Sequence, residues 1–202
     1  ALDLLKKEKY DHIIGVDGAL KFCKEQNIVP TRIVGDFDTL DPEILTWYQT
    51  HTQIEIRQFN PVKDATDTQI AIELAMELGS RKITLVGGTG TRLDHVMGNI
   101  QTLYLPFAKG IDCRIVDAHN RIRLVSGELH LKMTEQWGKY VSLIPFTTDV
   151  EGVDLTGFKY PLEKFGFTVL GTGSRGVSNE IAEEEAVIRI EKGIMILVES
   201  KD

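Results

Sequence analysis

The chain has 202 residues and a formal net charge of −7 at pH 7. This length supports one large domain or two modest ones, each with its own core. The negative charge disfavours nucleic acid and anionic membranes as partners and favours a cationic small molecule, and no apolar run approaches the ~20 residues of a membrane-spanning helix.

The two cysteines, Cys23 and Cys113, lie far apart in the sequence and show neither a CxxC motif nor the spacing of a metal site. Cys23 falls in a helical pattern, and Cys113 falls in an apolar strand pattern. We therefore expect both to be buried, reduced thiols, as is usual in a cytoplasmic protein.

The first part of the chain alternates between strand-like and helix-like segments. Asp41 and Pro42 form a typical helix start, with Asp41 as the N-cap and Pro42 at the first helical position. Such βαβ alternation predicts an α/β domain with a mostly parallel sheet and helices on both faces. The predicted segments are strands at 12–17, 32–36 and 53–57 and helices at 18–26 and 41–50.

Two carboxylates follow the second predicted strand, in the run Gly35-Asp36-Phe37-Asp38-Thr39. Asp36 and Asp38 are poorly placed for burial at the end of a strand unless a cation lies between them. Oxygen ligands of this kind suit Mg²⁺, which usually takes one or two carboxylates together with substrate phosphates. The alternative is a solvated turn in which Asp36 and Asp38 cap backbone N–H groups.

A helix with a capping box is predicted after the third strand. Thr66 is its N-cap and Gln69 its third residue. Asp67 then lies in the first turn, where the helix dipole favours the ionised carboxylate. Lys63 and Asp64 lie on the incoming loop, and Lys63 is able to reach a phosphate as a point charge.

Acidic side chains are expected to meet at one edge of the sheet. The C-terminal ends of parallel strands share an edge, so Asp36, Asp38, Asp64 and Asp67 should converge there, with Asp17 as a fifth acid. Like charges that close are costly without a metal or a cationic ligand. The alternative for Asp67 is an ordinary acidic residue in the first turn of a helix.

A glycine-rich segment follows the clearest strand of the first half, at 82–86. It reads Gly87-Gly88-Thr89-Gly90-Thr91-Arg92-Leu93-Asp94-His95. Clustered glycines let the backbone approach a phosphate, and the helix expected at about 94–109 adds its positive end. Arg92 offers a fork that suits phosphate oxygens. The segment is neither a P-loop nor a dinucleotide motif; the alternatives are a tight turn and, for His95, a helix-cap role.

The strand predicted at 112–116 ends in two polar residues, Asp117 and Asn120. Each of them either contacts a base or ribose edge or merely forms a turn. Asn120 also marks the point at which the helical period disappears, so we place the domain boundary there. The predicted domains are 1–120 and 121–202.

The second part of the chain predicts an all-β antiparallel sandwich, because short alternating segments are separated by turn residues. A hairpin turn is expected at Glu191-Lys192-Gly193. The loop at 171–180 is rich in Gly, Ser and Asn and either holds a heteroaromatic ligand or is a flexible tip. The predicted strands are 121–126, 130–133, 139–145, 150–155, 167–170, 186–190 and 194–198.

Taken together, these segments resemble the thiamine pyrophosphokinase (thiamine diphosphokinase) family over nearly the whole chain. No single segment is decisive, but their order and spacing, with the change from α/β to β, make the match specific. The matching segments are Asp17-Gly18, Gly35-Asp36-Phe37-Asp38-Thr39, Lys63-Asp64-Ala65-Thr66-Asp67, the glycine-rich segment 87–95 and Ser178-Asn179-Glu180.

The resemblance implies a cytoplasmic, homodimeric enzyme that uses Mg²⁺ and ATP. It would transfer the β,γ-diphosphoryl group of ATP to the hydroxyl of thiamine, giving thiamine diphosphate and AMP. The second domain would contribute to thiamine binding and to dimerisation.

The resemblance also implies roles for individual residues. Asp36, Asp38 and Asp67 would hold Mg²⁺ and the phosphates, and Asp64 would complete the catalytic set. Thiamine would be held by Asp17, Ser178 and Asn179. The residues implied in ATP binding are Lys63, Gly87, Gly88, Thr89, Gly90, Arg92, Asp94, His95 and Asn120.

Two other functions account for part of the pattern. One is a Mg²⁺-dependent diphosphokinase or nucleotidyl transferase that acts on another alcohol. The other is a non-catalytic protein that binds thiamine or a nucleotide. A pure binder of a cation needs one carboxylate rather than several beside a phosphate loop, so the acidic clusters favour an enzyme.

Overall fold

The computed structural model describes residues 2–38, 40–60 and 65–202 of the chain. The chain divides into two compact units, each of which is described by itself. The first comprises residues 1–83 with 108–112, and the second comprises residues 84–107 with 113–202. The boundary predicted near Asn120 stays a prediction.

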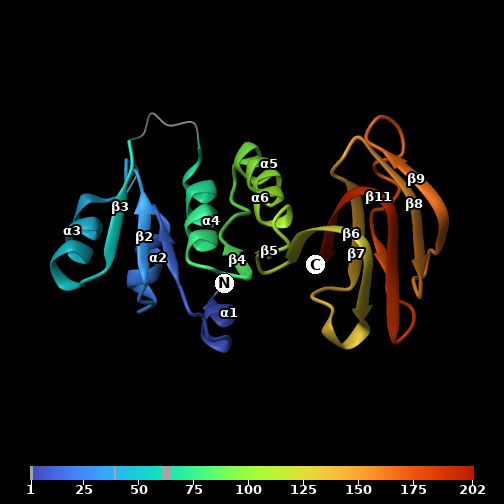
Figure 1. The fold of residues 1–202 in the computed structure, drawn as a ribbon. Helices are drawn as coiled ribbons and strands as arrows, with labels where there is room; N and C mark the ends of the chain where they lie inside the picture. The colour runs from blue at the N-terminus through green and yellow to red at the C-terminus, as the bar shows by residue number, and fades with distance from the viewer. Residues whose placement is uncertain (1, 39, 61–64) are drawn as a thin grey trace. The chain divides into compact units, whose positions relative to one another are not determined.

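A three-stranded parallel sheet forms the centre of the first unit, in the order β1-β2-β3. Its helices and strands are α1 (Leu2–Lys7), β1 (Ile14–Val16), α2 (Ala19–Glu25), β2 (Arg32–Gly35), α3 (Pro42–His51), β3 (Glu55–Gln58) and α4 (Asp67–Glu77). Figure 1 shows α3 and α4 on opposite sides of these strands.

Helices cover both faces of this sheet, and β2 contributes side chains to each face because successive residues of a strand point to opposite sides. Ile33 packs with residues of α2 and α3, including Leu20 and Tyr48, in one buried cluster. Val34 packs with Ala71 and Leu74 of α4 in another. The prediction of a parallel sheet with helices on both faces is confirmed.

Two helix starts in this unit form as the sequence predicts. Asp41 accepts a hydrogen bond from the backbone N–H of Glu43 at 3.0 Å and caps α3. The hydroxyl of Thr66 accepts the N–H of Gln69 at 3.2 Å and caps α4. The Gln69 amide donates to Glu73 at 2.9 Å and does not return to the cap, so the capping box is half formed.

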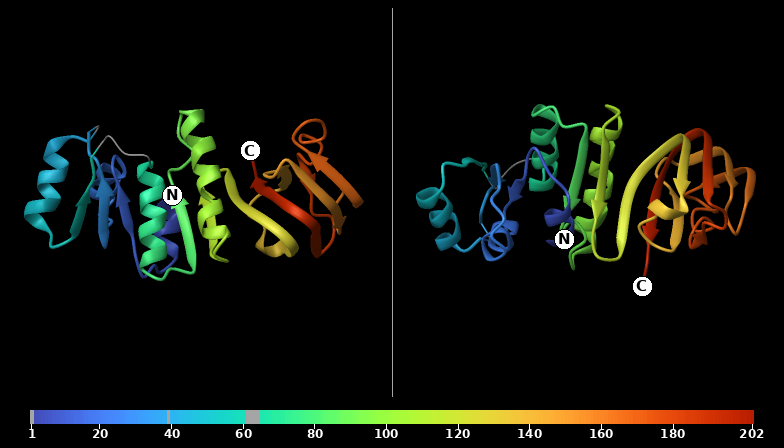
Figure 2. Two further views of the ribbon diagram at one scale, coloured as in Figure 1. Left: turned by 45° about the horizontal axis from the view of Figure 1, so that its top comes forward. Right: turned by 90° about the horizontal axis from the view of Figure 1, so that it is seen from below.

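An eight-stranded, mostly antiparallel sheet dominates the second unit. Six strands follow the order β10-β7-β11-β6-β5-β4, and β8 pairs with both β11 and β9. Both views of Figure 2 show β11 beside β6. The strands are β4 (Lys82–Val86), β5 (Asp112–Val116), β6 (Asn120–Lys132), β7 (Tyr140–Pro145), β8 (Asp149–Thr156), β9 (Leu162–Thr168), β10 (Asn179–Glu180) and β11 (Glu185–Ser200), with a 3₁₀ turn at Met133–Glu135.

The core of the second unit is formed by side chains from its strands, and almost all of these are aliphatic. Val153, Ile188, Met195 and Leu197 have no exposed surface, and Phe167 is 2 % exposed. These residues come from β8, β9 and β11. Together with the α/β unit, this mostly antiparallel β unit confirms the predicted fold class.

The hairpin turn predicted at Glu191-Lys192-Gly193 is wrong, because β11 runs through it as one strand. The register against β6 shifts between Ile190 and Met195, and Gly193 has φ +101. A β-bulge uses the same glycine signal as a hairpin turn, so the local sequence did not separate the two. Likewise, the strands predicted at 121–126 and 130–133 are one strand, β6, which continues through Gly127 with φ +67 opposite Ile190.

The helix predicted at about 94–109 is two helices, α5 (Leu93–Thr102) and α6 (Tyr104–Phe107). Pro106 explains the break. A proline inside a helix lacks the N–H for the residue four positions earlier, here Thr102, and its ring clashes with that carbonyl. Thr102 is the last residue of α5.

Candidate functional site

Three carboxylates come together where two neighbouring strands of the first unit end. Asp17 directly follows β1, and Asp36 and Asp38 follow β2. One ligand atom from each lies within 4.8 Å of the other two. The cluster forms because β1 and β2 are parallel neighbours, with Val16 opposite Val34, so the two chain segments leave the sheet at one edge.

The backbone around this cluster is constrained. Phe37, between the two acids of the second segment, has φ +60 and is only 8 % exposed, and Asp17 has φ +44. A Cβ at Gly35 would lie 2.9 Å from the Phe37 ring and 3.3 Å from the Cα of Asp17. Residue 35 must therefore be glycine for the two segments to approach, and burial of Phe37 holds Asp36 and Asp38 in place.

Asp36 serves as a turn cap as well as a cluster member. Its Oδ1 accepts the backbone N–H of Asp38 at 3.2 Å. The side chains of Asp17 and Asp36 are half-buried, and that of Asp38 is exposed. Three carboxylates this close repel one another, and an oxygen-rich set of this kind fits a hard divalent cation such as Mg²⁺.

Two of the three predicted metal ligands, Asp36 and Asp38, are in this cluster. Asp17, which we associated with thiamine, is in it. Asp67 is the first residue of α4 and, among the residues that the structure describes, is not part of this group. Lys63 and Asp64 lie outside the described residues. Their roles stay predictions.

In the second unit, the glycine-rich segment connects β4 to the start of α5. Gly88 is buried, and a Cβ there would lie 2.9 Å from a methyl group of Leu85 and 3.3 Å from one of Ile115. The carbonyl of Gly88 accepts a hydrogen bond at 2.9 Å from Asn99, a buried residue of α5. The loop is thus fixed against both the strand before it and the helix after it.

Thr89 in the same loop donates its hydroxyl proton to Oδ2 of Asp117 at 2.6 Å. Asp117 also accepts the backbone N–H groups of His119 and Asn120 at 2.7 and 2.6 Å. Burial raises the pKa of Asp117, but the hydrogen bonds from Thr89, Asn120 and the turn outweigh it and leave that pKa below its ordinary value. Asp117 and Asn120 therefore form the turn that we gave as one alternative.

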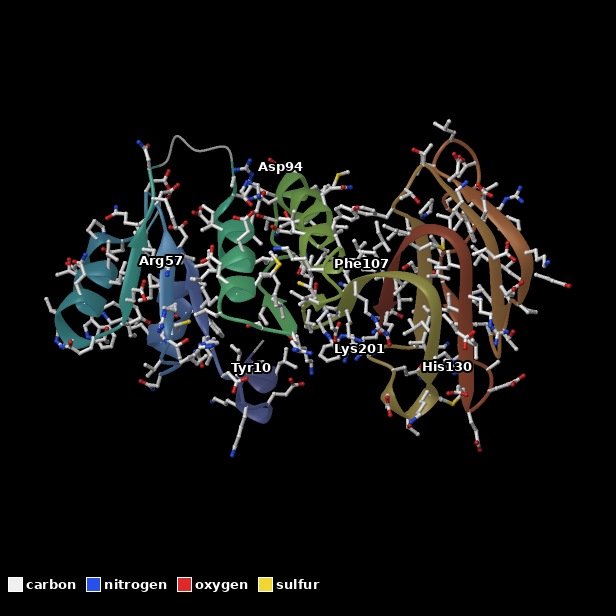
Figure 3. The ribbon with its side chains drawn as sticks, viewed as in Figure 1. Tyr10, Arg57, Asp94, Phe107, His130 and Lys201 are labelled. Carbon is white, nitrogen blue, oxygen red and sulfur yellow. The ribbon has the colours of Figure 1, made fainter. Side chains whose placement is uncertain are left out.

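Arg92 and Asp94, at the start of α5, bind each other. The guanidinium donates from Nε to Oδ1 at 3.2 Å and from Nη2 to Oδ2 at 2.5 Å. The hydrogen bond from Arg92 lowers the pKa of Asp94 to about 2. Both side chains are well exposed, as is His95, and Figure 3 labels Asp94, which lies in the first turn of α5. An incoming anion would find this Arg92 fork already paired.

Ser178 directly precedes β10, and Asn179 is the first residue of that strand. Ser178 is exposed in a left-handed conformation with φ +61, and its N–H donates to the buried hydroxyl of Ser142 at 3.0 Å. Asn179 is 7 % exposed. Its Oδ1 accepts the backbone N–H of Tyr160, and its Nδ2 donates to the carbonyl of the same residue. Asn179 thus supports the segment, while the neighbouring Ser178 is exposed.

Sequence reasoning missed two residues that shape these segments, Asn99 and Tyr160. A lone asparagine on the inner face of a predicted helix is the signal that Asn99 offered. Tyr160 gave no signal, because its partner Asn179 lies 19 positions later in the chain. The cysteine prediction is confirmed: Cys23 and Cys113 are buried thiols and are not joined in a disulfide.

Comparison with known proteins gives matches over both parts of the chain. The family model for the thiamin pyrophosphokinase catalytic domain matches residues 3–115, and that for the thiamin pyrophosphokinase vitamin B1 binding domain matches residues 127–195. No helix in the described part of the chain is long and apolar enough to cross a membrane.

Individual relatives agree with the family models. A thiamine pyrophosphokinase of Bacillus subtilis (strain 168) is 34% identical over 195 residues, which cover 94% of this chain and 87% of the relative. The crystal structure of a thiamine pyrophosphokinase from Bacillus subtilis matches with a TM-score of 0.88 at 32% identity, over 98% of this chain and 92% of that one. A structure from Geobacillus thermodenitrificans matches with a TM-score of 0.86, also at 32% identity, over 99% and 91%. The chain therefore belongs to the thiamine pyrophosphokinase family.

Proposed function

We propose that this thiamine diphosphokinase binds Mg²⁺ on the carboxylates of Asp17, Asp36 and Asp38 and uses it in transferring diphosphate from ATP to thiamine. The products are thiamine diphosphate and AMP. The observation that carries the proposal is the three-carboxylate cluster, whose ligand atoms lie within 4.8 Å of one another. Such a set binds a divalent cation, whereas a turn alone needs one carboxylate.

The cation would neutralise the negative charge that develops on the transferred diphosphoryl group and on the AMP that leaves. The residues of this chain contribute by positioning. Burial of Phe37 fixes the two acids on either side of it before any ligand binds. The assignment of Asp64 and Asp67 to catalysis rests on the family resemblance.

For ATP, we propose the glycine-rich segment at 87–90 as the phosphate-binding loop. Its close packing, the hydrogen bond from Asn99 to Gly88 and the start of α5 support this assignment. Arg92 would exchange Asp94 for phosphate oxygens, since its fork suits either partner. The roles of Lys63, His95 and Asn120 in ATP binding are proposed from the resemblance alone.

For thiamine, we propose that the hydroxyl of Ser178, an exposed residue, contacts the substrate and that Asn179 holds the segment. The vitamin B1 binding model covers this part of the chain, which favours thiamine over another alcohol as the acceptor. We also propose a cytoplasmic homodimer, as the resemblance implies; the two buried thiols agree with a reducing compartment.

A direct test compares Asp36→Asn with Asp41→Asn. Both changes remove one negative charge from the loop between β2 and α3, but Asp41 caps α3 and asparagine is an equally good cap. With ATP, Mg²⁺ and thiamine, Asp36→Asn should lose most AMP and thiamine diphosphate formation, and calorimetry should show weaker Mn²⁺ binding. Asp41→Asn should match the wild type. Equal activity in the two variants would remove Asp36 from the metal site.

A further inference from the structure

We propose that Asp117 is a positioning residue for the nucleotide: it fixes the glycine-rich loop through the hydroxyl of Thr89 and does not touch ATP itself. This inference rests on the proposed function, in which that loop binds the phosphates of ATP. All of the residues concerned belong to the second unit.

The two oxygens of Asp117 share one partner, the Asn120 amide, which lies 3.1 Å from each of them, and differ in their other partners. Oδ1 accepts the N–H of His119 at 2.7 Å, the N–H of Asn120 at 2.6 Å and the Asn120 amide at 3.1 Å. These contacts complete an ordinary turn, which the carbonyl of Asn120 closes by accepting the Asp117 N–H at 2.9 Å. The two backbone N–H groups of the turn that bind this side chain therefore both donate to Oδ1.

Oδ2 of Asp117 reaches beyond the turn to Thr89, 28 positions earlier in the chain, at 2.6 Å. That length is typical of a hydroxyl donating to an ionised carboxylate, which is a stronger bond than one between neutral groups. The hydroxyl has one proton and gives it to Asp117, so Thr89 does not have it for a phosphate. Its role is to hold the backbone between Gly88 and Gly90.

The turn that carries Asp117 is itself anchored. The N–H of Lys201, just beyond β11, donates to the carbonyl of His119 at 3.0 Å. On its other side the loop is held by the hydrogen bond from Asn99 to the carbonyl of Gly88. The loop is thus tied to α5 and to the turn after β5, which keeps its backbone N–H groups in one arrangement before a phosphate arrives.

A second reading of the same contact predicts the opposite effect. Asp117 carries negative charge one side chain away from the proposed phosphate loop, and that charge on its own would repel ATP. If repulsion were its main effect, removing the charge would tighten ATP binding. If positioning is its main effect, removing either partner of the hydrogen bond weakens binding. The two readings differ in sign.

The experiment uses Thr89→Val, Thr89→Ser, Asp117→Asn and the double variant Thr89→Val/Asp117→Asn. Thr147→Val is the matched control, because its hydroxyl also bridges turn backbone in this unit, donating to Asp149 and accepting from Ile194. The measurements are calorimetric titration with ATP and Mg²⁺, the KM for ATP, the KM for thiamine, kcat from AMP release, and the melting temperature of each variant.

Thr89→Val should raise the Kd and KM for ATP roughly tenfold, which corresponds to about 1.4 kcal/mol, with the KM for thiamine unchanged. Thr89→Ser should restore the wild-type values. Asp117→Asn should weaken ATP binding in the same direction, and the double variant should be no worse than the more damaged single variant, because both remove one interaction. Thr147→Val should leave ATP binding unchanged.

Unchanged ATP binding in Thr89→Val, tighter binding in Asp117→Asn, or additive losses in the double variant would overturn the positioning role. If Asp117→Asn fails to fold, Thr89→Val still decides, since it removes only a hydroxyl. Wild-type turnover separates the two proposals. A wild type that forms no AMP from ATP and thiamine contradicts the proposed function, whereas an active wild type with an unaffected Thr89→Val contradicts only the role of Asp117.

Discussion

The side chain of Asn179 pairs with the backbone of Tyr160 as a neighbouring strand would. Its Oδ1 accepts the Tyr160 N–H at 3.0 Å, and its Nδ2 donates to the Tyr160 carbonyl at 2.8 Å. The same Oδ1 accepts the N–H of Glu180 at 2.9 Å. Both polar groups of this buried amide are thus committed to the protein, and the adjacent Ser178 is held by them.

We predict that Asn179→Ala and Asn179→Asp are both destabilising, by about 1–3 kcal/mol, because each leaves backbone groups of Tyr160 unsatisfied. An aspartate keeps the acceptor but places an oxygen against the Tyr160 carbonyl, so it should not rescue the alanine variant. Both should also raise the KM for thiamine. Urea denaturation and steady-state kinetics measure these effects, with the exposed Glu183→Ala as the control. Full stability in Asn179→Asp would contradict this account.

A buried ion pair in the second unit gives a separate prediction about stability. Glu199 of β11 has no exposed surface and accepts hydrogen bonds at 2.6 Å from both Nε and Nη2 of Arg121. Arg121→Met would leave this carboxylate buried without its cation, at a cost of about 3–5 kcal/mol. The double variant Arg121→Met/Glu199→Leu should recover much of that loss. Guanidinium unfolding of the wild type and both variants tests this, and a double variant less stable than Arg121→Met would refute it.

Features that depend on neighbouring residues were the ones that the sequence predicted well. The caps at Asp41 and Thr66 form because the signal and its partner lie two or three positions apart. The break caused by Pro106 could also have been predicted from the sequence, but we predicted one helix across it. The turn signal at Gly193, in contrast, is equally consistent with a bulge, and only pairing with β6 decides between them.

The sequence predicted which types of residue form the candidate site better than it predicted which of them come together in space. Asp17 joins Asp36 because β1 and β2 are adjacent, and strand order depends on how the whole sheet assembles. The bond from Thr89 to Asp117 joins residues 28 positions apart. No local pattern specifies such a partner, since any of several acids would offer the same chemistry.

The pH dependence of stability should reveal the cluster around His130. Hydrogen bonds with Glu128 at 2.9 Å and Glu185 at 3.2 Å raise the pKa of His130, and Arg189 also binds Glu128, at 2.6 Å. Figure 3 labels His130, which is half-exposed. Because the folded-state pKa lies above the unfolded value of about 6.5, the stabilisation is present below that pH and is lost as pH rises through the folded pKa.

For this reason the difference in melting temperature between the wild type and His130→Gln should be larger at pH 6 than at pH 9, and it should shrink in high salt, because the group is exposed. Thermal melts of both proteins across this range make the measurement. A difference that grows with pH would contradict the sign of the shift.

Two glycines of the same loop should respond differently to alanine. A Cβ at Gly88 would lie 2.9 Å from Leu85 and 3.3 Å from Ile115, whereas a Cβ at Gly90 would meet nothing within 4 Å. Gly88→Ala should therefore destabilise the protein by about 1–3 kcal/mol through overpacking, and Gly90→Ala should leave the free energy of unfolding unchanged. If a phosphate binds against the loop backbone, Gly90→Ala should still weaken ATP binding, because a methyl group would occupy the approach to the N–H groups. Denaturation and ATP titration of the two variants separate packing from binding: equal stability losses at both positions would contradict the packing described, and ATP binding unaffected by Gly90→Ala would place the phosphates elsewhere.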